Sequence, residues 1–222
     1  MTALGLRRVP TQSRREHVVE ILREAITSGR LKPGDRLIET DLSKQLGTSR
    51  APIREALRQL EQEGLVASYP YRGSEVLGVS QDEIEQVLVP IRITLERYAF
   101  AQAITRLVEE DFEELRELVA EMDSAAHEGA TDRLADADIR FHELIVVRSE
   151  QRHCLQVWKT IQPRVRAYFR RDAPAHTDPT SVAAQHRQLL EVLQSGDKAA
   201  ALDAIDRHIH IHLAPKATTD AQ

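Results

Sequence analysis

Residues 29–73 of the 222-residue chain read GRLKPGDRLIETDLSKQLGTSRAPIREALRQLEQEGLVASYPYRG. Leu42 and Leu46 lie four residues apart, as they would on one face of a short helix, and Gly47 stands where that helix would stop. Ser49 is then a good N-cap for a following helix, because its side chain can accept a hydrogen bond from the first turn. The stretch therefore predicts a helix, a tight turn and a second helix.

The sequence on either side of this motif completes a small unit. Residues 13–28 carry apolar side chains at helical spacing, which predicts a preceding helix. After Gly64, two short β-rich runs flank Pro70 and Gly73, a pattern typical of a small hairpin. A hairpin that closes a three-helix unit is a wing, so we predict a winged helix-turn-helix over residues 10–78.

The helix that follows Ser49 carries arginines away from its apolar stripe. In a winged helix-turn-helix the start of this helix enters the major groove, where an arginine can bond O6 and N7 of guanine. Ser49, Arg50 and Arg54 lie where such contacts are expected. The alternative interpretation is that Arg50, Arg54 and Arg58 form an ordinary solvated helix face.

Charge is distributed unevenly along the chain, whose formal net charge is −5. Residues 1–78 hold 13 Lys plus Arg against 10 Asp plus Glu, a balance of +3, and the remainder holds 17 against 25, a balance of −8. The N-terminal third is therefore the candidate partner of a polyanion. With 41% apolar and 29% charged residues the chain is expected to fold as a globular protein rather than remain disordered.

No membrane or secretory signal is visible in the sequence. No apolar run approaches the roughly 20 residues needed to cross a bilayer, and the polar start lacks the apolar core of a signal peptide. A single cysteine, Cys154, fits a reducing compartment. We expect a cytoplasmic protein with no membrane partner.

From Ser80 onward, apolar residues recur at spacings of three and four, with no convincing strand. Short connections between such segments favour an antiparallel bundle. We therefore predict a mainly α protein, whose second domain is an all-helical bundle of about six helices over residues 80–215. The predicted helices are 81–106, 109–127, 131–148, 150–171, 180–195 and 197–213.

Four residues of this bundle have the chemistry of a metal site. Asp138 and His142 are four residues apart, so their side chains share one helix face. His186 and His208 lie on two other predicted helices and could complete a set of one carboxylate and three imidazoles, which suits zinc, nickel, manganese or iron rather than calcium. Because the chain has nine histidines, a structural or surface role for these residues is the alternative.

The N-terminal string resembles the DNA-binding domain of GntR-family regulators. The resemblance implies that Ser49, Arg50 and Arg54 contact DNA from the recognition helix and that Arg72 and Gly73 approach it from the wing. Some relatives have a further DNA-contacting arginine where this chain has Thr40, so the preferred operator is expected to differ. The matching residues are Pro33, Gly34, Leu42, Leu46, Gly47, Ser49, Arg50, Pro52, Arg54, Glu55, Ala56, Leu57, Gly64, Leu65, Arg72 and Gly73.

Residues 80–213 resemble the FCD effector domain of the FadR subfamily, through the strings IRITLE, DIRFHELI and QHRQLLEVLQSGDKAAALDAIDRHI. Metal-dependent members use an Asp and a His four apart plus one His from each of the last two helices. By this resemblance the ligands of a divalent transition metal, zinc in the first place and nickel, manganese or iron as alternatives, are Asp138, His142, His186 and His208. His212, one turn after His208, is an alternative or supporting ligand.

The resemblance also implies a function for the two domains together. The chain is expected to be a DNA-binding transcription regulator, a repressor that binds an inverted-repeat operator as a homodimer and responds to a small carboxylate effector at the metal. Arg92 is the candidate effector anchor, with an internal ion pair to Glu96 as the alternative.

Two readings from other classes compete with a regulator: a metal-dependent enzyme built on the bundle, and a helical interaction module with structural histidines. His142 and Glu143 begin like a zincin motif, but Val146 stands where the second histidine is needed, so we expect no enzyme.

Overall fold

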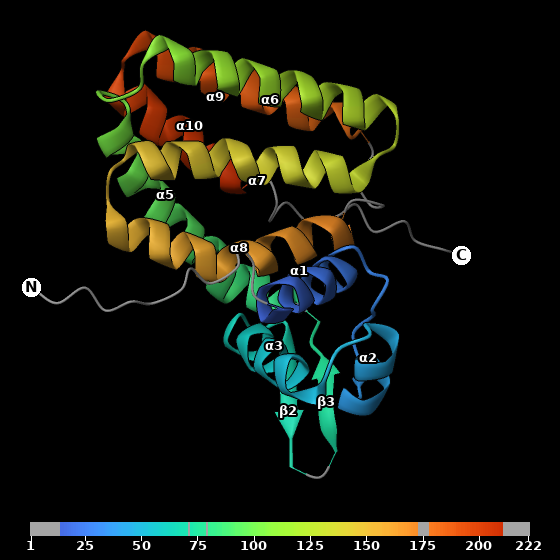
Figure 1. The fold of residues 1–222 in the computed structure, drawn as a ribbon. Helices are drawn as coiled ribbons and strands as arrows, with labels where there is room; N and C mark the ends of the chain where they lie inside the picture. Colours follow the sequence, from blue (N-terminus) through green and yellow to red (C-terminus); the bar gives the residue numbers. More distant parts are fainter. Residues whose placement is uncertain (1–13, 71, 79, 173–177, 211–222) are drawn as a thin grey trace, which may run out of the picture. The chain divides into compact units, whose positions relative to one another are not determined.

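The computed structural model describes residues 14–70, 72–78, 80–172 and 178–210. The chain divides into two compact units, Met1–Gly78 and Val79–Gln222 (Figure 1). The first is a winged helix-turn-helix and the second is a helical bundle, which confirms the predicted fold class. None of the helices in the described ranges is long and apolar enough to cross a membrane.

The first unit combines helices with a small antiparallel sheet, in which the strand order is β1-β3-β2. Helix α1 packs against α3 over an apolar core that includes Val19, Ile53 and Leu60. The sequence predicts the β2–β3 hairpin but not β1, because two residues are too few for an alternating pattern. The elements are α1 (Arg14–Thr27), β1 (Arg36–Leu37), α2 (Glu39–Gln45), α3 (Arg50–Gln62), β2 (Val66–Tyr69) and β3 (Gly73–Val76).

The turn between α2 and α3 has the expected chemistry at Gly47. Its φ of +59° lies in the left-handed region, where a side chain would be strained. Ser49 occupies the N-cap position of α3 with extended backbone angles (φ −75°, ψ 165°), but its side chain makes no capping hydrogen bond. The exposed Ser49 hydroxyl is therefore not committed to the helix end.

The second unit is a bundle whose helix α7 packs against α5, α6 and α8, while α10 packs against α5 and α9 (Figure 1). Its core includes the fully buried Phe100, Phe141 and Trp158. The elements are α4 (Gln81–Glu83), the π-helical turn η1 (Ile84–Leu88), α5 (Val89–Ala103), α6 (Glu109–His127), α7 (Thr131–Arg148), α8 (Arg152–Asp172), α9 (Thr180–Ser195) and α10 (Lys198–His210).

The helix predicted over residues 81–106 is interrupted by η1 and ends at Ala103. In η1 the Val89 N–H donates to the carbonyl of Ile84, five residues earlier instead of four. Pro90 follows directly and has no N–H to donate, and a wider turn accommodates that missing hydrogen bond. The regular helix that resumes at α5 then carries the side chains that reach the bundle interior.

Candidate metal centre and DNA-reading helix

Four side chains from three helices meet inside the bundle. Asp138 and His142 come from α7, His186 from α9 and His208 from α10, and all four are buried. Their potential ligand atoms all lie within 4.8 Å of one another. The structure thus brings together the whole set that the sequence predicts as metal ligands.

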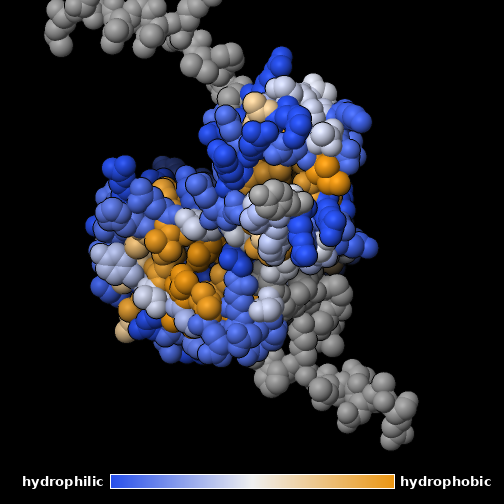
Figure 2. Space-filling model, turned by 90° about the horizontal axis from the view of Figure 1, so that it is seen from below, coloured by the Kyte–Doolittle hydropathy of each residue, from blue (hydrophilic) through white to orange (hydrophobic). Residues whose placement is uncertain are grey.

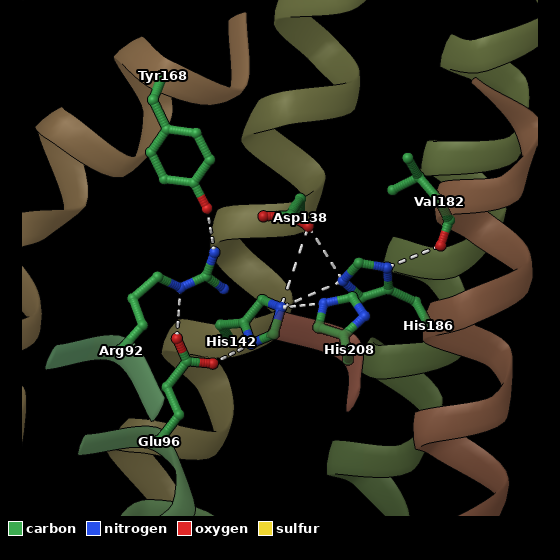
Figure 3. A network of polar contacts seen from close by, with 8 residues as sticks. All are labelled: Arg92, Glu96, Asp138, His142, Tyr168, Val182, His186 and His208. Atoms are coloured by element: carbon green, nitrogen blue, oxygen red, sulfur yellow. Dashed lines mark hydrogen bonds and ion pairs between the residues drawn. The ribbon is translucent and has the colours of Figure 1, made fainter. Parts of the chain in front are cut away.

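The distances between these atoms suit a shared cation. Nε2 of His142 lies 3.2 Å from Nε2 of His208 and 3.3 Å from Nε2 of His186 (Figure 3). Oδ1 of Asp138 lies 3.2 Å from Nε2 of His186. An ion at about 2.1 Å from two adjacent nitrogens separates them by about 3.0 to 3.4 Å, so the four residues fit a first-row transition metal.

Contacts behind two of the imidazoles orient them in the way that metal ligation requires. Nδ1 of His142 lies 2.6 Å from Oε2 of Glu96, and Nδ1 of His186 lies 2.8 Å from the carbonyl oxygen of Val182. The Val182 carbonyl accepts a hydrogen bond, which assigns the proton of a neutral His186 ring to Nδ1, and the carboxylate beside Nδ1 of His142 favours the same tautomer there. The Nε2 lone pairs then face each other, and a cation between them would remove that repulsion.

The carboxylate of Asp138 completes the donor set. Burial alone would raise the pKa of Asp138, but the contacts with His186 and the neighbouring His142 and Arg92 outweigh it and hold the pKa well below its usual range. Among the described residues, Oδ1 of Asp138 has no hydrogen-bond partner of acceptable geometry. An ionised, buried and unsatisfied oxygen is costly by itself, which further favours a cation at this point.

Arg92 is fully buried beside these four residues. Its Nε donates to Oε1 of Glu96 at 2.7 Å, and its Nη1 donates to the Tyr168 hydroxyl at 2.7 Å. Burial would raise the pKa of Glu96, but the charge of Arg92 and the contact with His142 outweigh it and hold that pKa at about 2. The ion pair considered as an alternative for Arg92 is therefore present.

The ion pair does not exclude an anchoring role, because it leaves part of the guanidinium unused. Within the described residues, Nη2 of Arg92 has no hydrogen-bond partner. The guanidinium end is directed toward Asp138 and His142 (Figure 3). A buried donor that faces the metal centre suits an anionic ligand.

Sequence reasoning missed two parts of this centre. The sequence pattern presents Glu96 only as a partner of Arg92, although an acid on an apolar helix face is itself a sign of a buried contact. Tyr168 gave no signal, because an aromatic residue on a helix is usually core. His210 is exposed, whereas His212 lies outside the described residues, so its suggested role stays a prediction.

The predicted DNA-contacting residues of α3 share its exposed beginning. Ser49 is exposed, and the side chains of Arg50 and Arg54 are 57% and 54% exposed. Both arginines contact the carboxylate of Glu39, the first residue of α2, which sequence reasoning did not single out. The start of α3 thus presents a polar, cationic surface.

Of the wing residues, Arg72 lies in the turn between β2 and β3, and Gly73 is the first residue of β3. Arg72 and Gly73 are exposed, and the Arg72 N–H donates to the carbonyl of Tyr69 at 3.2 Å. The φ of Gly73 is +79°, which explains the need for glycine at this position. The geometry permits a close backbone approach of the kind expected for a wing.

A mostly apolar hollow of about 570 Å³ opens on the surface of the second unit between α5 and α8. Val87, Tyr98 and Val157 on it are between 43% and 49% exposed. Apolar side chains gather on the face shown in Figure 2. Exposed apolar surface of this kind is typical of a protein–protein contact.

Two protein families match the chain. The family described as "Bacterial regulatory proteins, gntR family" matches residues 14–76, and the FCD domain matches residues 87–210. These matches correspond to the winged unit and to the bundle that holds the four metal-binding candidates.

Several known proteins are similar over most of their length. The probable D-xylose utilization operon transcriptional repressor of Paenarthrobacter nicotinovorans is 32% identical over 85% of this chain and 82% of its own. The uncharacterized transcriptional regulator YdhC of Bacillus subtilis is 29% identical over 85% and 84%. The solved structure of E. coli McbR/YncC is 26% identical, with a TM-score of 0.79 over 92% of this chain and 97% of that one. The similarity is to transcription regulators, which confirms the prediction that the chain is not an enzyme.

Proposed function

The chain belongs to the GntR family of bacterial regulatory proteins and carries an FCD domain; from this premise we propose that it is a FadR-subfamily repressor controlled by a small carboxylate. As a member of that family it is a DNA-binding transcription regulator. The effector would bind at a metal held by Asp138, His142, His186 and His208. The observation that carries this proposal is the convergence of these four buried donors beside the unused Nη2 of Arg92.

We assign one task to each domain. Residues 10–78 would bind DNA, and residues 80–215 would bind the effector and dimerise. Repression is supported by relatives that are named as repressors, among them the D-xylose and gluconate operon proteins. A cytoplasmic location follows from contact with DNA.

Zinc is the metal we propose, with nickel, manganese or iron as alternatives, because three imidazoles and one carboxylate suit borderline cations. When bound, such an ion supplies a Lewis-acidic anchor for an effector oxygen. Glu96 and the Val182 carbonyl would keep the rings of His142 and His186 in the required orientation.

The charges buried around the centre indicate the charge of the effector. Asp138 and Glu96 contribute two negative charges and Arg92 one positive charge, all of them buried. With neutral imidazoles and a divalent cation, one positive charge remains. A buried charge has to be compensated, so a monocarboxylate balances the site, while a dicarboxylate leaves one negative charge in excess.

We expect the zinc-loaded protein to bind a short monocarboxylate at least about tenfold more tightly than the dicarboxylate of equal chain length. Butyrate and succinate form such a pair, and isothermal titration calorimetry measures both affinities. The same titrations after removal of the metal with a chelator provide the control, and binding should then be lost. Equal affinity with and without metal, or tighter binding of the dicarboxylate, would contradict the assignment.

The apolar hollow between α5 and α8 is the surface that we assign to the homodimer. Val87, Tyr98 and Val157 leave apolar area exposed there, and contact with a second copy would cover it. A two-fold dimer places two recognition helices on successive major grooves, which matches an inverted-repeat operator. Such a dimer would have two arrangements, one that binds the operator and one that does not. The effector would bind one arrangement more tightly than the other and so shift the equilibrium between them.

Replacement of Arg50 by alanine is expected to weaken binding to the preferred operator by about 1 to 3 kcal/mol and to relax selectivity at one base position. The reason is the loss of a bidentate contact with a base edge. Fluorescence anisotropy measures the affinity, and analytical ultracentrifugation should find two chains per operator. Arg58→Ala is the matched control on the same helix. Unchanged operator affinity of Arg50→Ala would remove Arg50 from the reading surface.

A further inference from the structure

One carboxylate holds both of the arginines at the start of α3. Oε2 of Glu39 accepts hydrogen bonds from Nη2 of Arg50 at 2.9 Å and from its Nε at 3.2 Å. Nε of Arg54 donates to Oε1 of Glu39 at 3.1 Å, and its Nη2 donates to Oε2 at 3.2 Å. Because Glu39 begins α2, these contacts connect the two helices of the helix-turn-helix at the surface assigned to DNA.

The Glu39 carboxylate is charged at neutral pH, but its ion pairs with the two arginines are weak. The hydrogen bonds from Arg54 and Arg50 hold the pKa of Glu39 below its usual value, so the carboxylate is ionised at neutral pH. Its side chain is 26% exposed, and those of the arginines are more than half exposed. Water screens such exposed pairs, so either arginine can exchange Glu39 for a base edge at little cost.

While it is formed, the contact also biases the direction in which the guanidiniums point. Glu39 occupies Nε and Nη2 of both arginines, whereas no hydrogen bond of the described residues uses Nη1 of either one. A long side chain that is held in one direction before binding loses less freedom when it binds. At the same time, the negative charge of Glu39 repels any DNA phosphate that approaches the pair.

We propose that Glu39 is a positioning residue that raises sequence discrimination: it orients Arg50 and Arg54 toward base edges and opposes their unspecific use as phosphate contacts. The proposal rests on the DNA contacts assigned above to both arginines. A cognate operator offers base acceptors that replace the carboxylate, whereas a random duplex offers mainly phosphates. Glu39 therefore opposes unspecific binding more than cognate binding.

The test compares Glu39→Gln with the wild-type full-length protein on two duplexes. One is an operator selected by the wild type from a random library, and the other is a scrambled duplex of equal length. Anisotropy titrations over a series of salt concentrations should show about three- to tenfold tighter binding of Glu39→Gln to the scrambled duplex and no gain on the operator. The salt dependence on the scrambled duplex should become steeper by up to about one unit of slope.

Asp41→Asn is the matched control, because Asp41 is an exposed acid in the first turn of the same helix. The substitution removes the same charge as Glu39→Gln, but Asp41 contacts neither arginine. It should therefore change the affinities for the operator and for the scrambled duplex by the same factor. The proposal would be overturned if Glu39→Gln behaved like Asp41→Asn, or if it left the ratio of operator affinity to scrambled-duplex affinity unchanged. A wild type that fails to distinguish the two duplexes would instead overturn the DNA contacts on which the proposal rests.

Discussion

Replacing His142 with alanine is expected to abolish metal binding by a protein that still folds. Nε2 of His142 lies 3.2 Å from Nε2 of His208 and 3.3 Å from Nε2 of His186, so His142 is a central member of the proposed ligand set. Removing a residue that only hydrogen-bonds to a metal ligand already lowers metal affinity about 10- to 100-fold, so removing the ligand itself should lower it further. Elemental analysis of protein purified without chelator measures the bound metal directly.

A second readout comes from Trp158, the one tryptophan in the sequence. Its ring centroid lies 6.2 Å from that of His142, so Ni²⁺ at the centre should quench its fluorescence in the wild type and leave it unchanged in His142→Ala. Added metal should also raise the Tm of the wild type only, because an ion that binds the folded state stabilises it.

His153→Ala is the control for removal of a histidine as such, because His153 is exposed on α8, away from the cluster. It should retain stoichiometric metal and the quenching. His186→Ala tests the same site through α9 and should lose metal as His142→Ala does. Stoichiometric metal in both site variants would mean that these four residues do not form the metal centre.

The sequence predicted the architecture well for reasons that are visible in particular residues. Gly47 ends α2 and Gly73 shapes the wing because few other residues adopt their backbone angles, so the composition of the turns placed the elements. The observed ends of α6 and α7 are the ends predicted from the apolar periodicity, 109–127 and 131–148. By contrast, η1 depends on which carbonyl Val89 bonds to, and no pattern of apolar residues encodes that choice.

The site was predictable only in part. Spacing places Asp138 and His142 on one face of a helix, but the approach of His186 and His208 depends on how α9 and α10 pack. Resemblance to the FCD domain supplied that step. The contacts of Glu96 with His142, of Tyr168 with Arg92 and of Glu39 with Arg50 and Arg54 join different helices, and a single sequence gives no signal for such pairs.

The largest loss of stability is expected from Arg92→Met. The change removes the partner of Oε1 of Glu96 and leaves that carboxylate buried with only the contact to His142. It also breaks the hydrogen bond from α5 to Tyr168 on α8. Removal of one member of a buried ion pair costs about 3 to 5 kcal/mol, because the other charge stays in a medium that cannot solvate it.

Urea unfolding of the metal-free protein, followed by Trp158 fluorescence, measures this loss. Trp158 lies in the second unit, so its signal reports the bundle and not the DNA-binding unit. The unfolding midpoint of Arg92→Met should fall by about 1 to 3 M urea. The double variant Arg92→Met/Glu96→Leu is the control, since it removes both charges and should recover most of the stability. If the single variant unfolded within about 0.5 kcal/mol of the wild type, Arg92 would not compensate a buried charge, and the balance that selects a monocarboxylate would lose its basis.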